Sequence, residues 1–172
     1  NSDKGDGQGN NATVRVNQSQ ALLEHLGDQS DWDALPVFIL GDTNAYSRET
    51  ALTVLETAGF TNIAAQYDPE HTTYQFGGML GSLDHALGND AAMELVTDAR
   101  IWNINADEPI VYEYSRRNYN VVDFHEDNYF RSSDHDPVKV GFSFGGRTTP
   151  DPVDPGQGGS LRSSSLGALS SR

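Results

Sequence analysis

Residues 36–44 read PVFILGDTN, an apolar run that closes on a glycine, an acid and an amide. A continuous apolar run of this length, bounded by polar turns, is typical of a β-strand that is covered on both faces. Acid and amide side chains directly behind such a strand lie at its carboxyl end, where α/β proteins commonly place ligands. The same side chains, Asp42 and Asn44, could instead form an ordinary Asx turn, and this stretch alone leaves both interpretations open.

Helical patterns flank this strand. Apolar residues of 13–26 lie roughly on one helical face before Gly27, and residues 48–58 repeat the pattern before Gly59. Four short β-like segments follow along the chain: 73–76, 83–87, about 95–104, and an alternating strand at 138–144. Helices and strands in this order predict an α/β fold.

The sequence predicts one domain over residues 1–145 and a tail over 146–172. A chain of 172 residues, 36% of them hydrophobic, is long enough for one domain with its own core. After Gly145 the composition changes to Thr, Pro, Asp, Gly and Ser, which is typical of a linker. Within the tail, GGSL at 158–161 resembles the start of a Gly-Gly surface-sorting signal, although an arginine and a serine run interrupt it.

The charge of the chain argues mildly against direct binding to nucleic acid. Its net charge is -14, whereas phosphate contacts usually come from a basic face. Composition alone favours a solvated acidic surface, and the alternative is that some carboxylates hold divalent cations that face a phosphate. The absence of cysteine excludes disulfides and thiolate zinc sites. No apolar run is long enough to span a bilayer, so we expect no membrane insertion.

A second polar cluster lies in SLDHAL, residues 82–87. An acid inside a strand-like segment costs free energy unless it is paired or hydrogen-bonded, so Asp84 is predicted to have a partner. Strand alternation points the neighbouring His85 to the opposite face.

A third cluster, RSSDHDP at 131–137, immediately precedes the last strand. Asp134 could bind a metal through oxygen, and His135 could contact a phosphate oxygen or hold a catalytic proton. A polar turn in which Pro137 starts the strand would explain the same residues.

Taken in order, the three clusters resemble the GDxN, xxDH/Y and SDHxPV motifs in the C-terminal half of the endonuclease/exonuclease/phosphatase (DNase I-like) superfamily. The similarity covers about residues 1–144 and points to secreted bacterial nucleases. It implies the C-terminal half of a DNase I-like two-sheet β-sandwich flanked by helices. It also implies a metal-dependent phosphodiesterase that hydrolyses DNA, with RNA as a second substrate, outside the cell or at its surface.

The resemblance assigns roles to five residues. Asp42 would activate the attacking water and contact the metal, and Asn44 would orient the water or the phosphate. Asp134 would bind Mg²⁺ or Mn²⁺, with Ca²⁺ as a further candidate. His135 would contact the scissile phosphate, while Asp84 would hydrogen-bond His135 and favour its charged form.

The long segment 105–133 is rich in Tyr and Asn and supplies three candidate contacts to a nucleic-acid backbone, Arg116, Arg117 and Arg131. For its tyrosines, anchoring of the loop is the favoured interpretation.

The superfamily also uses an Asn, a metal-binding Glu and a His or Tyr from the N-terminal half of its domain, and these have no counterpart in this sequence. We therefore expect little or no turnover from this chain alone. Two alternatives stay open: a phosphoesterase of the same superfamily that acts on a phospholipid or inositol phosphate, and an inactive fragment that binds metal or phosphate.

Overall fold

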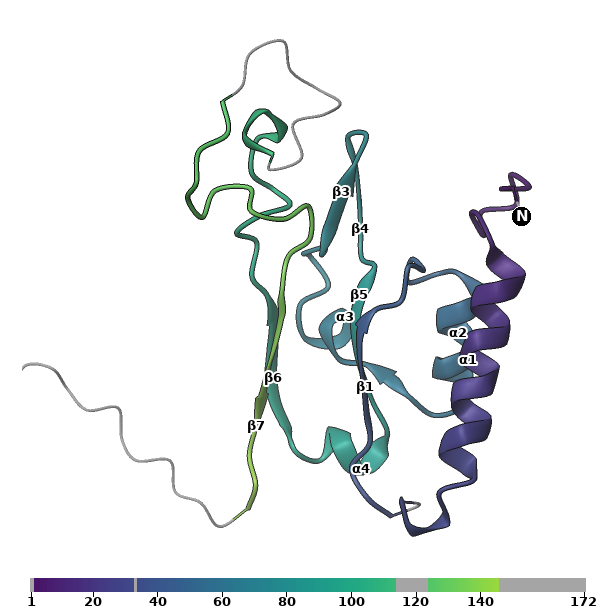
Figure 1. Cartoon of the computed structure of the whole chain (residues 1–172). Helices are drawn as coiled ribbons and strands as arrows, with labels where there is room; N and C mark the ends of the chain where they lie inside the picture. Colours follow the sequence, from purple (N-terminus) through teal and green to yellow (C-terminus); the bar gives the residue numbers. More distant parts are fainter. Residues whose placement is uncertain (1, 33, 114–123, 146–172) are drawn as a thin grey trace, which may run out of the picture.

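The computed structural model describes residues 2–32, 34–113 and 124–145 (Figure 1). Along the chain, the helices and strands are α1 (Ala12–Gly27), β1 (Phe38–Asp42), α2 (Thr50–Thr57), β2 (Thr61–Asn62), α3 (Ile63–Tyr67), β3 (Tyr74–Phe76), β4 (Met79–Gly81), β5 (Asp84–Gly88), α4 (Asp90–Met93), β6 (Val96–Ile101) and β7 (Val138–Phe142), with 3₁₀ turns at Ser30–Trp32 and Ile110–Tyr112. None of the helices in these ranges is both long and apolar enough to cross a membrane.

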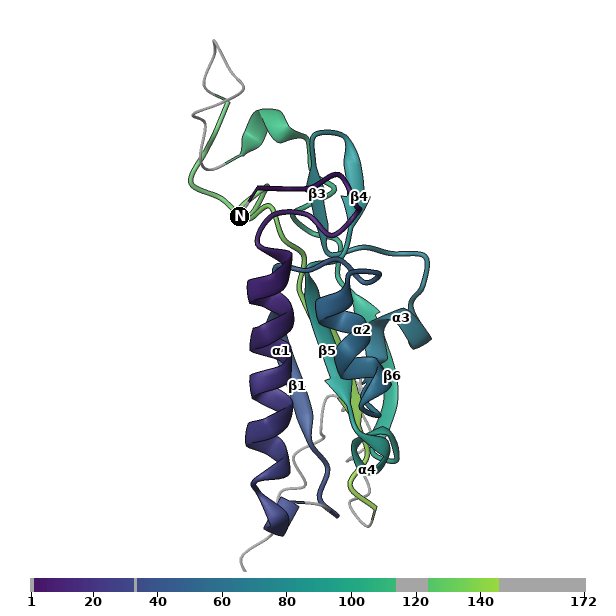
Figure 2. The same cartoon turned by 90° about the vertical axis from the view of Figure 1, so that its right-hand side faces the viewer.

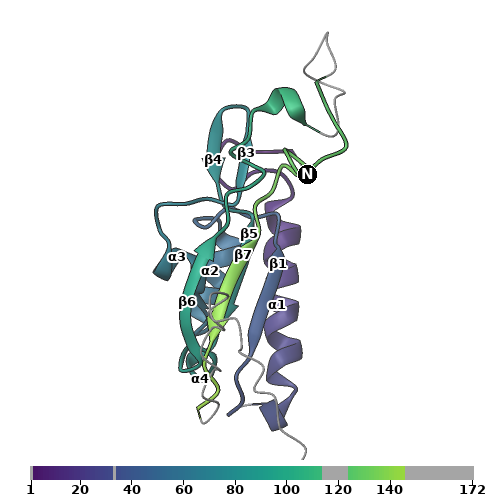
Figure 3. The same cartoon turned by 90° about the vertical axis from the view of Figure 1, so that its left-hand side faces the viewer.

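The strands of the described residues form antiparallel pairs. One sheet has the order β1-β5-β2, while β3 pairs with β4 and β6 pairs with β7. Figure 2 shows α1 and α2 packed on one side of β1 and β5, and Figure 3 shows the β6–β7 pair on the side away from these helices. The arrangement is therefore layered, with helices, the β1-β5-β2 sheet and then the β6–β7 pair.

Two apolar clusters hold these layers together. The first lies between the helices and the sheet, where Leu52 and Leu55 of α2 pack with Leu87 of β5. The second joins the sheet and α3 to the β6–β7 pair through Ile63, Ala86, Val96 and Ala99. Because β5 faces both clusters with alternate side chains, it is the central strand of the layered structure.

The predicted strand at 36–41 is present as β1, and the prediction that it is covered on both faces holds at its start, where Phe38 packs against the second cluster, but is wrong at Leu40. Ile39 packs against the helix-side cluster, whereas the next residue, Leu40, is 67% exposed. Leu40 lines an apolar groove of about 340 Å³ together with Val138, Val140 and Phe142. A continuous apolar run shows that both faces can be buried, but it does not show what covers the second face.

The helices predicted over 13–26 and 48–58 are confirmed as α1 and α2. The β3–β4 hairpin was only half predicted, since the residues of β4 were not expected to be a strand. Its two turn residues, Gly77 and Gly78, have φ of 58° and 80°. Two consecutive positive φ angles are what a two-residue hairpin turn requires, and they are easily adopted only by residues such as glycine.

Candidate active site

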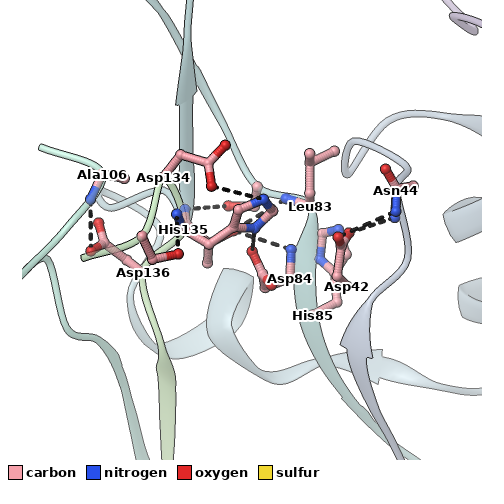
Figure 4. A network of polar contacts seen from close by, with 12 residues as sticks. Asp42, Asn44, Leu83, Asp84, His85, Ala106, Asp134, His135 and Asp136 are labelled. Atoms are coloured by element: carbon pink, nitrogen blue, oxygen red, sulfur yellow. Dashed lines mark hydrogen bonds and ion pairs between the residues drawn. The ribbon is translucent and has the colours of Figure 1, made fainter. Parts of the chain in front are cut away.

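The centre of the candidate site is a hydrogen-bonded pair, Asp84 and His135. Asp84 begins β5, and His135 lies in the loop before β7, yet the Nδ1 atom of His135 is 2.6 Å from Oδ2 of Asp84. The Tyr74 ring packs against the imidazole with 4.7 Å between ring centroids. The predicted partner of Asp84 is thus confirmed, and Figure 4 shows the imidazole between Asp84 and Asp134.

Charge around His135 favours its protonated form. Burial alone would lower its pKa, but the hydrogen bond to Asp84 and the charges of Asp84, Asp134 and Asp42 outweigh burial and raise the pKa above 6.5. Because the folded-state pKa is raised, the stabilisation by this pair is fully present below the unfolded pKa and is lost as the pH rises through the folded pKa. An imidazolium can donate from Nε2, the nitrogen that faces away from Asp84.

Asp42 lies beside this pair because of strand register. Asp42 is the last residue of β1 and sits opposite Asp84 in the β1–β5 ladder. Its Oδ1 accepts a hydrogen bond from the Asn44 main-chain N–H at 2.7 Å, and its Oδ2 accepts one from Asn44 Nδ2 at 3.2 Å. The ordinary Asx turn is therefore present. Since a carboxylate has about four acceptor positions, two hydrogen bonds leave room for a water molecule or a cation.

A buried threonine connects the two halves of the pair. Thr73 is fully buried, and its Oγ1 accepts hydrogen bonds from the main-chain N–H groups of Leu83 and Asp84, both at 3.1 Å. The Thr73 carbonyl accepts from the N–H of Asp136 at 2.7 Å. One residue thus fixes the start of β5 and the loop that carries His135.

Asp136 fixes the same loop from the other side and is 1% exposed. Its Oδ1 accepts from the main-chain N–H groups of Ile104, Asn105 and Ala106 at 3.0, 2.7 and 3.0 Å, and its Oδ2 accepts from Asn103 Nδ2 at 2.9 Å. Sequence reasoning gave Asp136 no role, although its place between His135 and the strand-starting proline was a signal that it is close to the site.

The prediction that Arg131 contacts the substrate is wrong. Its side chain is 1% exposed, with φ of 46°, and Nη1 donates to the carbonyl oxygens of Asn105, Ala106 and Glu108. The guanidinium therefore satisfies main-chain acceptors of a buried loop, where it is unavailable to a phosphate. The other two candidates, Arg116 and Arg117, lie outside the described residues.

His85 points away from the pair, as strand alternation predicted. Its ring contacts Asn62 Nδ2 at 3.1 Å and the Ala45 carbonyl at 3.0 Å. Burial lowers the pKa of His85, so its neutral form is favoured. This histidine belongs to the core between β5, β2 and the loop after β1.

The carboxylates of Asp42 and Asp134 fit a hard divalent cation by ligand type. Both carboxylates are at least partly accessible to solvent, and the negative charge of each raises the pKa of His135. Across the parts of the chain that the structure describes, no three His, Cys, Asp or Glu residues gather into a metal-binding group.

A substitution at Asp84 tests the electrostatics of the pair. Asp84→Asn removes the negative charge but keeps an oxygen near Nδ1, so we expect the pKa of His135 to fall. Titration of the imidazole C–H signals by NMR, in EDTA, measures this pKa, and His25 on α1 serves as the reference. An unchanged His135 pKa in Asp84→Asn would contradict the assignment.

Neither the protein-family models nor the curated proteins contain a match. Among solved structures, the chain matches a crystal structure of an endonuclease/exonuclease/phosphatase family protein from Bacteroides thetaiotaomicron, with a TM-score of 0.52 and 18% identity over 76% of this chain and 45% of the other.

The chain therefore has the fold of part of an endonuclease/exonuclease/phosphatase family protein, and the predicted fold class is confirmed. It spans less than half the length of that relative. The identity of 18% bears on the fold alone, so the roles of Asp42, Asn44, Asp84, Asp134 and His135 stay predictions.

Proposed function

We propose that the chain is part of the catalytic domain of a metal-dependent phosphodiesterase that hydrolyses DNA, with RNA as a second substrate, outside the cell or at its surface. The observation that carries the proposal is the Asp84–His135 hydrogen bond of 2.6 Å, with the carboxylates of Asp42 and Asp134 beside it. A cationic donor next to accessible carboxylates suits hydrolysis of a phosphate ester. The donor can hydrogen-bond a phosphate oxygen, and a carboxylate can accept a proton from the attacking water.

In the proposed mechanism, each side chain acts at a defined atom. His135 donates from Nε2 to a non-bridging phosphate oxygen, while Asp84 holds Nδ1 and keeps the ring oriented. Asp42 accepts a proton from the attacking water, whose oxygen bonds to phosphorus as the bond from phosphorus to the leaving ester oxygen breaks. The leaving oxygen takes a proton from solvent. The two hydrogen bonds that Asp42 accepts from Asn44 fix the carboxylate in place. Asp134, with Asp42, would hold Mg²⁺ or Mn²⁺, which when bound supplies positive charge to the phosphate.

Nicking of supercoiled plasmid DNA tests the proposal. The assay uses the 172-residue chain and the longest polypeptide encoded in frame with it. We expect little turnover from the chain alone, and Mg²⁺-dependent nicking by the longer polypeptide that is lost in EDTA and in Asp134→Ala. Asp98→Ala, which removes an exposed acid of β6, is the matched control and should leave nicking unchanged.

Two results would contradict the proposal. Nicking by the longer polypeptide that persists both in EDTA and in Asp134→Ala would exclude the proposed role of the metal and of this carboxylate. Upstream coding sequence that lacks the expected Asn, Glu and His or Tyr would argue against a complete nuclease site.

A further inference from the structure

A second pocket adjoins the Asp84–His135 pair, and of its lining residues only Asp84 has a role in the mechanism above. It has a volume of about 530 Å³ and is lined by the loop after β1, the loop after α3, and the junction of β4 and β5. Its polar lining includes Arg48, Asp68, His71, Ser82 and Asp84. Because Asp84 belongs to both, the pocket lies directly beside the candidate catalytic pair.

One wall of this pocket depends on a glycine. The Tyr46 ring lies so close to Gly81 that a Cβ atom there would be 2.5 Å from the ring. Only a glycine permits this approach without movement of the ring. The tyrosine therefore has a defined position at the pocket wall, between the loop after β1 and the end of β4.

One cation of the pocket has no carboxylate partner among the described residues. Two carboxylates line it, and each has a histidine partner at 2.6 Å: Asp68 with His71, and Asp84 with His135. The Arg48 side chain is exposed and has no hydrogen bond or ion pair with any residue in the described parts of the chain. Arg48 is thus the one lining cation of this pocket that the described residues leave uncompensated.

His71 adds a second donor. The hydrogen bond to Asp68 is the main cause of the raised pKa of His71, and the negative charges of Asp68 and Asp107 raise it further. Burial and the positive charge of Arg100 lower the pKa, but by less. The side chain is 52% exposed, so Nε2, which does not contact Asp68, can reach a ligand. Arginine with an imidazolium and nearby hydroxyl groups is a donor set suited to a phosphate.

We infer that this pocket, the Arg48 pocket, binds the substrate phosphate that flanks the scissile one, with Arg48 and His71 as its ligands. The inference rests on the proposed function for its substrate class. A volume of about 530 Å³ exceeds what one phosphate needs and accommodates an attached nucleoside against the Tyr46 ring. In an acidic chain, an arginine without a carboxylate partner among the described residues offers a phosphate a charged donor close to Asp84.

Binding in EDTA tests this inference without any turnover. The 172-residue chain is titrated with inorganic phosphate and with two thymidine dinucleotides, TpT and pTpT, which differ by one terminal phosphate. We expect pTpT to bind about three- to tenfold more tightly than TpT, because charged hydrogen bonds at an exposed site are partly screened. Phosphate and pTpT should also raise the NMR-measured pKa of His71 and leave that of His25 unchanged.

Variants separate the Arg48 pocket from general charge effects. Arg48→Ala should lose most of the preference for pTpT, because only His71 remains as a ligand, and Arg48→Lys should keep more of it. Lys139→Ala removes a cation of β7 that does not line the pocket and should behave like the parent chain. Equal binding of the two dinucleotides by the parent chain, or an unchanged preference in Arg48→Ala, would overturn the inference.

The outcomes also separate this inference from the proposed function. If pTpT is preferred through Arg48 but the longer polypeptide does not nick DNA, the pocket stands as a phosphate site and the nuclease proposal fails. If DNA is nicked and the preference is absent, the nuclease proposal stands and the Arg48 pocket is not a phosphate site.

Discussion

Alanine in place of His135 is expected to lower the rate of DNA cleavage about 10²- to 10⁴-fold in any polypeptide that contains this chain and cleaves DNA. The imidazole is the cationic group that Asp84 orients at 2.6 Å, and nothing else in the described site can donate from the same position. Its loss removes both the positive charge and the hydrogen-bond donor that would stabilise the phosphate in the transition state. Initial rates at saturating Mg²⁺ measure the effect.

His25→Ala is the matched control for this substitution. His25 lies in the last turn of α1, away from the β5–β7 side of the molecule. Its removal should change the rate of DNA cleavage by less than about twofold. The parent rate should fall as the pH rises through the raised pKa of His135, because the charged form is lost. Retention of near-parent activity in His135→Ala would remove the imidazole from the mechanism.

The sequence could predict the parts of the site that have a local cause. The apolar run before Asp42 predicted a strand with an acid at its carboxyl end, and the acid inside β5 predicted a partner for Asp84. Neither pattern identifies that partner, since His135 is 51 residues further along the chain. The motif resemblance supplied it, because the order of three clusters carries information about tertiary structure that spacing alone does not.

Other features have no local cause and were missed. Arg131 was predicted to contact a nucleic-acid backbone, but its side chain donates instead to three main-chain carbonyls in a buried loop. Thr73 is an ordinary strand residue by sequence, and its role follows only from where β5 starts. The exposure of Leu40 depends on what lies over β1, and residues 36–44 do not contain that information.

A substitution at Asp136 shows how far the candidate site depends on such buried acceptors. Asp136→Ala is expected to lower the free energy of unfolding by about 3–5 kcal/mol, because it leaves three main-chain N–H groups in a buried loop without an acceptor and removes one of the two acceptors of the Asn103 amide. Urea denaturation followed by circular dichroism measures this change. Asp98→Ala, which removes an exposed side chain of β6, should cost less than about 0.5 kcal/mol.

The asparagine variant separates loss of packing from loss of acceptors at the same position. Asp136→Asn keeps the shape and one oxygen, but its amide turns a donor toward groups that are themselves donors, so an intermediate loss of stability is expected. Because the N–H of Asp136 also bonds the Thr73 carbonyl, loosening this loop should weaken the Asp84–His135 contact and lower the His135 pKa in the folded Asn variant. If Asp136→Ala were as stable as Asp98→Ala, the buried carboxylate would not hold the loop, and other contacts, such as the Tyr74 ring and the Asn105 amide, would have to maintain the geometry of His135.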